Sequence, residues 1–375
     1  MSTIMQVLPA NILGGMEKET LETAKAIVQS GNNSLVVSRS GPIVAKLAEV
    51  NSLHYALNTK TTNPFNILRN RNQLVQIIKE HNVELMHARS RDAAWTCHLA
   101  SKKIDIALIT SVYGAYNNTN IFKRAYNKVI MKGDIIVAVS NFIKQYILAN
   151  YLITDESKVR VVPMGIDHRY YDLSNIKQNK VDEFKQKYAV PKDCIVLLLP
   201  SRFIASQGHQ LLIKALAKLR HLNFYCIMAG DLSKNPDYTV CIQNMINQLK
   251  LQSKIQIFGP EKDILHLYAL SDIVLSVAQE PEAFVRTLIE AQMMQKFVIT
   301  TNIGAAGQVV KDQDSGLHFQ SGNIQDLADK ISYALQEFNS EKYIQITKAG
   351  QLSALKSYPI EVVQKQLLDI YAELL

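Results

Sequence analysis

Residues 273–291 read IVLSVAQEPEAFVRTLIEA, and this stretch decides the fold. Its apolar beginning, residues 273–277, is typical of a strand buried in a parallel sheet. A polar loop with Glu282 follows, and then a helical pattern that carries Glu290. A strand that passes through a loop into a helix puts the loop at the carboxyl end of the sheet, where ligands bind in open α/β folds. Glu290 lies about two turns into the helix, so both carboxylates can face one crevice if the loop bends the chain back. For this spacing alone, a solvated helix start is the alternative.

The same alternation of short apolar runs and helical patterns continues in both directions along the chain. Such alternation predicts βαβ units and two doubly wound parallel sheets. We expect one domain over residues 1–170 and a second over residues 171–359, with the polar stretch 172–193 as a linker that contains one short helix. An amphipathic helix over residues 360–375 can pack on either domain, including back on the first. The expected strands are 5–8, 34–38, 85–87, 107–110, 135–140 and 159–163, then 195–199, 223–228, 254–258, 273–277 and 297–300.

Composition fits a two-domain globular chain, because 375 residues with 47% hydrophobic content exceed one ordinary core. No apolar run reaches membrane-spanning length, and the first residues lack the basic start of an export signal. We therefore expect neither a membrane span nor export. The four cysteines form no Cys-x-x-Cys pair, which favours reduced thiols over a metal site or disulfides. They are Cys97, Cys194, Cys226 and Cys241.

The net charge of +8 comes from the first half of the chain. Residues 1–170 hold 20 Lys and Arg against 12 Asp and Glu, whereas the remainder holds 21 of each. Lys123, Arg124, Lys128 and Lys132 recur at helical spacing, which indicates a stripe for an anionic surface or substrate. A solvated helix face is the alternative. Nucleic acid is disfavoured as a partner, because the chain carries no recognisable nucleic-acid-binding module.

Two further loops follow expected strands. Gly14-Gly15 precedes a helix, so its backbone N–H groups can face a phosphate or a sugar, although a plain tight turn is the alternative. The loop lacks the Rossmann glycine spacing and the P-loop lysine, which argues against a dehydrogenase and a P-loop NTPase. Arg202 follows the strand at 195–199, where a guanidinium can bind a diphosphate, although an ordinary surface arginine is the alternative. His209 is expected to cap the next helix.

Taken together, these elements resemble the GT-B glycosyltransferases of family 4, which transfer a sugar from a nucleotide-sugar with retention of configuration. The resemblance covers essentially the whole chain and implies two Rossmann-like domains facing a central cleft. Residues 12–22, 87–90 (HARS) and 280–284 look like the bacterial enzymes that build the lipopolysaccharide core, including mannosyltransferases. The motifs that carry the family resemblance are residues 14–17 (GGME), 137–140 (VAVS), 161–167 (VVPMGID), 201–208 and 282–290.

The resemblance implies roles for particular residues. Arg202 would neutralise the donor diphosphate, Glu282 would meet the donor sugar near the reacting carbon, and Glu290 would bind the ribose. No metal or other cofactor is expected, because positive side chains and helix N-termini stabilise the leaving diphosphate. The remaining donor-binding residues that the resemblance implies are Gly14, Gly15, Ala283 and Phe284, with Gly14 and Gly15 against the diphosphate or the acceptor.

Four positions depart from the family pattern, and they lie among the residues expected to take part in the reaction. Gln207 stands where a lysine usually contacts the diphosphate, and Tyr113 stands where a catalytic histidine is common. A tyrosine can donate a hydrogen bond but cannot act as a base near neutral pH. Val285 replaces a usual glycine, and Gln308 replaces a usual glutamate. Tyr113 and Gln207 are nevertheless counted with Arg202 and Glu282 as the candidate catalytic residues.

Two hypotheses follow from this pattern. The first is an active hexosyltransferase, with mannose as one candidate sugar, that uses a nucleotide-sugar donor and a lipopolysaccharide-core or similar anionic glycan or glycolipid acceptor. Peripheral contact with the inner face of the cytoplasmic membrane accompanies this hypothesis, because the basic stripe lies in the domain that receives the acceptor in this fold. The second is a weakened or inactive relative that acts as a binding or regulatory protein. A nucleotide-sugar epimerase is disfavoured by the two glutamates and the Gly-Gly loop.

Overall fold

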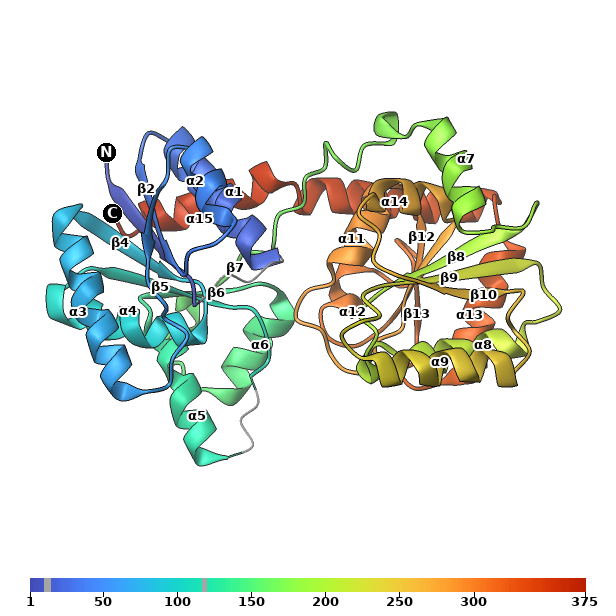
Figure 1. Ribbon diagram of the computed structural model, residues 1–375, viewed down its shortest axis with the longest axis horizontal. Coiled ribbons are helices and arrows are strands. Elements are labelled where there is room, and N and C mark those ends of the chain that lie inside the picture. The colour runs from blue at the N-terminus through green and yellow to red at the C-terminus, as the bar shows by residue number, and fades with distance from the viewer. Residues whose placement is uncertain (10–14, 117–119) are drawn as a thin grey trace. The chain divides into compact units, whose positions relative to one another are not determined.

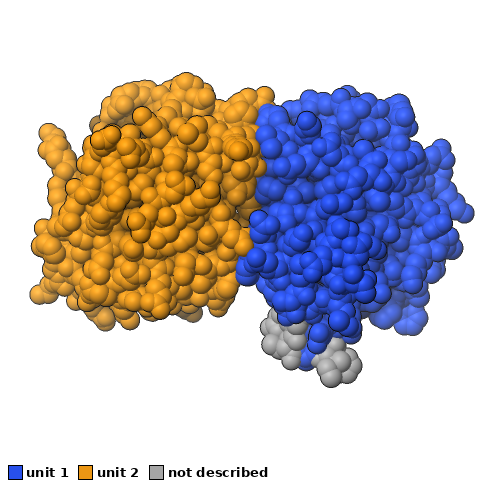
Figure 2. Space-filling view, turned by 180° about the vertical axis from the view of Figure 1, so that it is seen from behind, with its two compact units in different colours: residues 1–165, 360–375 blue, residues 166–359 orange. Residues whose placement is uncertain are grey.

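A computed structural model describes residues 1–9, 15–116 and 120–375 of the chain. They divide into two compact units: unit 1 is Met1–Gly165 with Ile360–Leu375, and unit 2 is Ile166–Pro359 (Figure 2). Each unit contains one parallel sheet with helices on both faces, which confirms the predicted α/β class (Figure 1). The boundary falls after residue 165 rather than after residue 170, and residues 360–375 belong to unit 1.

The sheet of unit 1 has seven strands in the order β3-β2-β1-β4-β5-β6-β7. The strand order reverses beside β1, which is the mark of a doubly wound sheet. Most residues of the inner strands are buried, because helices cover both faces of the sheet. The strands are β1 (Thr3–Val7), β2 (Asn33–Ser38), β3 (Leu53–Ala56), β4 (Val83–Ala88), β5 (Ala107–Val112), β6 (Ile135–Ala138) and β7 (Val159–Val161).

Helices α1, α2 and α15 lie along one face of this sheet, and α3 and α4 lie along the other (Figure 1). α15 (Ile360–Ala372) is amphipathic, and its Val363, Leu367 and Tyr371 join the core that contains Ile4 and Leu85. Ser90 and Ser140 cap α4 and α6 through their hydroxyls. The other bounds are α1 (Gly15–Gln29), α2 (Ile43–Glu49), α3 (Pro64–Glu80), α4 (Arg91–Ile104), α5 (Ile121–Asn127), η1 (Lys128–Lys132), α6 (Asn141–Asn150) and η2 (Glu156–Lys158).

The sheet of unit 2 has six strands in the order β10-β9-β8-β11-β12-β13. Its order reverses between β8 and β11, so the loops after these two strands diverge at the carboxyl edge. The strands are β8 (Ile195–Pro200), β9 (Phe224–Ala229), β10 (Ile255–Phe258), β11 (Ile273–Ser276), β12 (Phe297–Thr301) and β13 (Leu317–Phe319).

The helices of unit 2 form two layers, one on each side of the sheet. α8, α9 and α13 bury their apolar faces in one core, and α7, α10 and α11 bury theirs in the other. Their bounds are η3 (Leu173–Asn175), α7 (Gln178–Lys187), η4 (Ala205–Gln207), α8 (His209–Lys218), α9 (Pro236–Gln248), α10 (Ile264–Leu270), α11 (Arg286–Met293), α12 (Ala306–Val309), α13 (Ile324–Gln336) and α14 (Glu341–Ser357).

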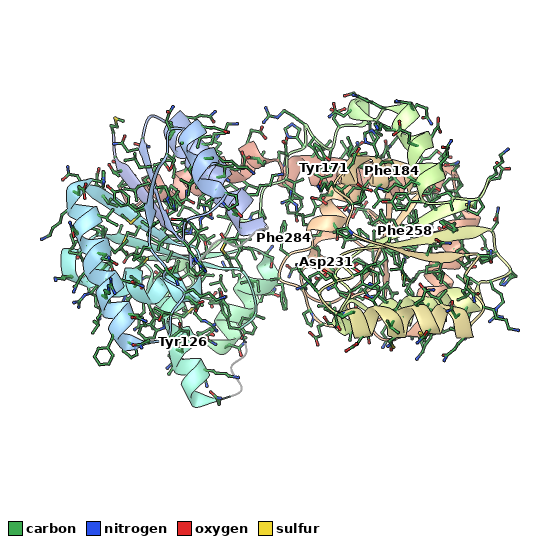
Figure 3. All side chains as sticks on the ribbon, in the orientation of Figure 1. Tyr126, Tyr171, Phe184, Asp231, Phe258 and Phe284 are labelled. Carbon is green, nitrogen blue, oxygen red and sulfur yellow. The ribbon has the colours of Figure 1, made fainter. Side chains whose placement is uncertain are left out.

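The stretch 172–193 is not a linker, which corrects the sequence-based prediction. Its helix α7 packs against α10, and Val181, Phe184 and Tyr188 are buried in the core of unit 2. The many charged residues of α7 cover only its outer face. Figure 3 labels Phe184 beside the aromatic residues of this layer. Among the described residues, no helix is both long and apolar enough to cross a bilayer.

Candidate functional site

A cavity of about 400 Å³ lies at the carboxyl end of the unit 2 sheet. Its walls come from the ends of β8, β9 and β11, from the loop after β10 and from the start of α11. This is the point where the strand order reverses, which is the usual ligand position in open α/β sheets. Asp231 and Phe284, both labelled in Figure 3, are among the lining residues.

Glu282 lines this cavity from the loop that follows β11. Gly304, at φ +62°, lets the next loop pack on this one, because a Cβ there would lie 2.7 Å from the Glu282 backbone nitrogen. Ala305 N–H donates to the Glu282 carbonyl at 2.9 Å, and Gln207 Nε2 donates to its Oε1 at 3.0 Å. Burial raises the pKa of Glu282, against the hydrogen bond from Gln207 and the charge of Arg202.

Gln207 is buried at the end of the short helix η4, where it reaches Glu282. The following Gly208 has φ +74°, and a Cβ there would lie 2.0 Å from the Val277 carbonyl oxygen. No side chain fits at that position, so the β8 loop is held directly against the end of β11. The side-chain amide therefore replaces the usual lysine with a neutral donor that orients one carboxylate oxygen.

Arg202 and the start of α11 give the cavity its groups for an anion. Arg202 is exposed, lines the cavity and has no hydrogen-bond or ion-pair partner among the described residues. α11 begins at Arg286, and its N-cap Val285 provides no side-chain hydrogen bond to the first turn. The uncapped N–H groups and the helix dipole favour a negative group at this end. Val285 has φ −118°, so this backbone position does not require glycine.

Glu290, the second glutamate of the sequence motif, is in a different position from Glu282. It is 5% exposed, and it is not among the described residues that line the cavity. Arg286 Nε donates to its Oε1 at 2.7 Å, and the Tyr268 hydroxyl donates to its Oε2 at 3.0 Å. Burial, followed by the charge of Glu290, raises the pKa of both Tyr268 and Tyr171. Glu282 therefore lines the cavity, whereas the Glu290 carboxylate is hydrogen-bonded to Arg286 and Tyr268.

Only some of the other residues predicted to bind the sugar donor line the cavity. Phe284 lines the cavity, whereas Ala283 beside it is partly exposed and does not. Gln308 is exposed on α12. Gly15 is the first residue of α1 in unit 1, where a Cβ would lie 2.7 Å from Met164 Cε. Gly14 lies outside the described residues.

Tyr113 belongs to a buried polar cluster of unit 1 that we call the Arg89 cluster. The Arg89 guanidinium donates to Tyr113 at 2.9 Å, to Glu19 at 3.0 Å, to Thr23 at 2.7 Å and to Gln6 at 3.0 and 2.7 Å. Burial is the largest influence on the pKa of Tyr113 and, with the Glu19 charge, raises it against Arg89. The phenol therefore stays protonated and can act as a hydrogen-bond donor but not as a base.

The four predicted basic residues are all exposed, but they do not lie on one α-helix. α5 ends at Asn127, and residues 128–132 form the 3₁₀ segment η1, so the four-residue spacing does not hold across the junction. Arg124 donates to the Asn150 carbonyl at 3.3 Å. Tyr126, labelled in Figure 3, packs near Trp95 and the Arg91 guanidinium. The four basic residues are therefore exposed on two different helical segments.

Sequence reasoning missed several residues of the cavity wall, notably Asp231, Glu261 and Arg286. Asp231 follows β9 and Glu261 follows β10, so the rule that ligands lie at strand ends would have found both. Arg286 and Glu290 are four residues apart on a helix, a spacing that predicts an ion pair. His209 does not cap α8 as predicted: Gly208 is the N-cap, and the buried imidazole contacts Ser201 Oγ at 3.1 Å.

The described part of the chain contains no group of three or more His, Cys, Asp or Glu side chains arranged to hold a metal ion. The acids of the cavity are instead paired with protein groups. The Glu261 carboxylate accepts from Lys187 and from the Tyr188 hydroxyl, and Glu282 accepts from Gln207. The cavity has the composition of a site for an anionic, hydroxylated ligand, because cations, a helix N-terminus and carboxylates all line it.

Comparison with known proteins agrees with this arrangement. Residues 13–170 match the family model Glycosyltransferase Family 4, and residues 180–352 match the model Glycosyl transferases group 1. The crystal structure of a glycosyltransferase from Rickettsia africae ESF-5 is 40% identical, covers 100% of this chain and 98% of its own, and superimposes with a TM-score of 0.93.

Two more distant matches add fold and family context. Anabaena Alr3699/HepE, in complex with UDP and glucose, is 20% identical over 100% of both chains with a TM-score of 0.83. The lipopolysaccharide 1,2-N-acetylglucosaminetransferase of Salmonella typhimurium is 26% identical over 196 residues, which are 48% of this chain and 50% of that protein. The two family models and the Rickettsia structure show that this chain belongs to glycosyltransferase family 4 and has the GT-B fold.

Proposed function

We propose that this glycosyltransferase takes a sugar from a nucleoside diphosphate sugar in the unit 2 cavity and transfers it, with retention, to an anionic glycan or glycolipid acceptor. The observation that carries the proposal is that the exposed Arg202, the uncapped start of α11 and Glu282 all line this one cavity. A diphosphate fits the cation and the N–H groups, and sugar hydroxyls fit the carboxylate. The relative crystallised with UDP and glucose supports this class of donor.

In this proposal the protein lowers the barrier mainly by stabilising the leaving diphosphate. Arg202 and the α11 N-terminus oppose the negative charge that develops as the sugar–phosphate bond breaks. Glu282 orients the sugar, because Gln207 fixes one of its carboxylate oxygens and leaves the other for the ligand. No metal is part of the proposal, and Tyr113 contributes a hydrogen bond rather than base catalysis.

The test is release of nucleoside diphosphate from UDP-, GDP- and ADP-sugars, GDP-mannose included, by the wild type and by Glu282→Ala. We expect the substitution to lower the rate by about 10²- to 10³-fold, as for other groups that stabilise a transition state. Glu280→Ala is the matched control, because Glu280 is exposed, lies two residues earlier and is not among the lining residues. An unchanged rate in Glu282→Ala would contradict the site.

The second hypothesis, a binding protein without turnover, has one observation in its favour. Residue 207 supplies a neutral amide where a lysine would add positive charge, and the amide is already engaged by Glu282. Tight nucleotide binding with no release from any donor would support that hypothesis over the first. The configuration of the transferred sugar, measured by nuclear magnetic resonance on the product, tests retention separately.

We also propose that the basic residues of α5 and η1 draw unit 1 to an anionic acceptor at the inner face of the cytoplasmic membrane. Lys123, Arg124, Lys128 and Lys132 are all exposed, and the resemblance to a lipopolysaccharide transferase makes a membrane-borne acceptor the fitting partner. Sedimentation with phosphatidylglycerol vesicles at low salt tests this. Lys123→Gln with Arg124→Gln should weaken binding several-fold, whereas Lys102→Gln with Lys103→Gln on α4 removes equal charge elsewhere.

If both pairs of substitutions reduce vesicle binding equally, the attraction comes from net charge rather than from this patch. No binding of the wild type to anionic vesicles at low salt, where screening is weakest, would contradict the membrane proposal.

A further inference from the structure

Phe65 is the most exposed aromatic side chain in the described part of the chain. It lies in the first turn of α3 and is 82% exposed, and Leu68, three residues later, is 42% exposed. Arg69 is exposed as well and lies one turn after Phe65, so the three side chains share one face of the helix. Apolar side chains beside cations on one helix face are typical of a surface that contacts a lipid interface.

The beginning of α3 is held in place by hydrogen bonds to the chain before it. Asn63 caps the helix, because its side chain accepts from the Phe65 N–H at 2.9 Å. The buried Asn70 donates to the Asn58 carbonyl at 2.9 Å and so fixes the preceding loop on the helix. Phe65 therefore projects from a fixed helix end. This end follows β3 and lies at the carboxyl edge of the unit 1 sheet.

The basic residues of α5 and η1 lie at the same edge. α3 packs against α4, and α4 packs against η1, which continues from α5 (Figure 1). Tyr126 of α5 donates to Asp92 in the first turn of α4 at 3.2 Å. Because α3, α4 and α5 all follow strands of one parallel sheet, their first turns lie at one edge of it. We call the following exposed residues the α3–α5 surface: Phe65, Leu68, Arg69, Lys123, Arg124, Lys128 and Lys132.

The helices around this surface are basic, whereas those on the other face of the sheet are not. α3, α4, α5 and η1 contain ten Lys and Arg against two Asp and Glu, whereas α1, α2 and α15 contain four against six. Neither residues 57–79 nor residues 106–133 include an acid. Among the described residues, no ion pair neutralises a cation of the α3–α5 surface. An anionic bilayer should therefore attract this face of unit 1 and repel the opposite one.

We propose that the α3–α5 surface docks unit 1 on an anionic bilayer, with Phe65 and Leu68 inserted between the lipid headgroups and the cations on the lipid phosphates around them. This inference rests on the proposed membrane contact of α5 and η1, to which it adds an apolar anchor and an orientation. The layer of α3, α4 and α5 faces the lipid, and the layer of α1, α2 and α15 faces away. The cations supply attraction that salt screens, and the apolar anchor supplies binding that salt does not screen.

Sedimentation with mixed phosphatidylglycerol and phosphatidylcholine vesicles over a series of salt concentrations separates the two contributions. Phe65→Ser should weaken binding about tenfold at each salt concentration, the lower end of the range for burying an apolar side chain, and should leave the salt dependence unchanged. Lys123→Gln with Arg124→Gln should instead reduce the salt dependence. Leu352→Ser is the matched control, because Leu352 is 70% exposed on α14 of unit 2.

Fluorescence of Phe65→Trp measures the insertion itself. On vesicles with brominated acyl chains, the emission of this variant should be shifted to shorter wavelength and quenched, whereas Leu352→Trp should show neither change. Trp95 is the single tryptophan of the chain, and its indole donates to the Tyr126 carbonyl at 3.1 Å. The wild type on the same vesicles gives the contribution of Trp95, which is subtracted.

One pair of charge substitutions tests the orientation. Arg69→Gln should weaken vesicle binding about fivefold, the effect of one cation near an anionic membrane surface, whereas Lys46→Gln should change it by less than about twofold. Both residues are exposed, but Lys46 lies on α2, on the other face of the sheet. Equal losses from the two substitutions would overturn the orientation.

The outcomes separate this inference from the proposed function. If the wild type binds vesicles, Phe65→Ser binds equally well and Phe65→Trp is not quenched, the inference fails and the electrostatic membrane contact stands. If the wild type binds no vesicles, both fail, and nucleoside diphosphate release still tests the transferase separately. If Phe65→Ser weakens binding to soluble heparin as much as binding to vesicles, the surface recognises a soluble polyanion and the inference is overturned.

Discussion

Arginine side chains near the carboxyl ends of the two sheets differ in how many of their N–H donors are bonded to protein groups. In unit 1 the Arg89 guanidinium is 1% exposed and donates to four protein side chains. In unit 2 the Arg202 side chain has no hydrogen-bond or ion-pair partner among the described residues, and the Arg286 side chain uses Nε alone. A cation whose donors are all filled by the protein holds the fold together. One with free donors on a cavity wall is available to a ligand. The number of unused donors, rather than the residue type, separates the two roles.

Replacing Arg89 in unit 1 should cause the largest loss of stability that we predict. Arg89→Met leaves the buried carboxylate of Glu19 and the amide of Gln6 without their shared donor, so unit 1 should lose about 3–5 kcal/mol of unfolding free energy. Urea denaturation followed by hydrogen exchange of β1 and β4 amides measures the loss unit by unit, since a two-unit chain need not unfold in one step.

Two variants sharpen this first prediction. Tyr113→Phe removes a single acceptor of the cluster and should cost only about 1 kcal/mol. Arg202→Met, in unit 2, should leave stability within about 0.5 kcal/mol while weakening nucleotide binding. Equal losses of stability from Arg89→Met and Arg202→Met would remove the distinction between the two arginines.

The next largest predicted effect is a loss of stability of unit 2 at low pH, caused by the buried imidazole of His209. Burial lowers its pKa to about 4, whereas an unfolded histidine titrates near 6.5. As the pH falls through 6.5, the unfolded state takes up a proton that the folded state does not, so unit 2 is destabilised. The contribution reaches about 2 kcal/mol at pH 5.

Comparing urea unfolding at pH 7 and pH 5 for the wild type and His209→Gln tests this value. The variant should lose less stability between the two pH values, because its amide does not titrate. An identical pH dependence in both proteins would show that another group is responsible.

The smallest predicted effect lies at the rim of the cavity. Glu261 has its pKa lowered to about 2: burial opposes the shift, and hydrogen bonds from Lys187, the Asp263 N–H and Tyr188 outweigh it. Its stabilising contribution is present above pH 4.5 and is lost as the pH falls toward 2. Lys187→Met should therefore move acid unfolding to higher pH and cost less than about 1 kcal/mol at neutral pH.

Lys192→Met is the control for this last variant, because Lys192 is also exposed and close in sequence. Similar acid unfolding of the two variants would contradict a specific role for the Lys187–Glu261 pair.

The inner strands could be predicted from their continuous apolar runs. Elements that carry many polar or charged residues were predicted less well. β8 and β11 are buried on both faces, so their composition alone identifies them. β3 is a partly exposed edge strand and was missed. A short helix was predicted in the stretch 172–193, but it was assigned to a linker because the charges of α7 hide the buried Val181, Phe184 and Tyr188, which recur at helical spacing.

The candidate site divides in the same way. Glu282 and Arg202 follow apolar strands, and strand ends are readable from sequence, so both were found at the cavity. The orientation of Glu290 was not readable, because it depends on Tyr268 from α10 and on which way the Arg286 side chain turns. The Arg89 cluster joins residues from β1, α1 and the loops after β4 and β5, and no local pattern predicts that convergence.

The chain passes from unit 1 to unit 2 after residue 165 and returns at residue 360, and this has a consequence for synthesis on the ribosome. α15 supplies Val363, Leu367 and Tyr371 to the core of unit 1, and the Tyr371 hydroxyl lies 2.7 Å from His87 Nδ1. Those residues are translated after the whole of unit 2. Domains usually fold in the order of their emergence. Here the first unit to emerge is the last to be completed, and until then its nascent core is exposed where α15 will bind.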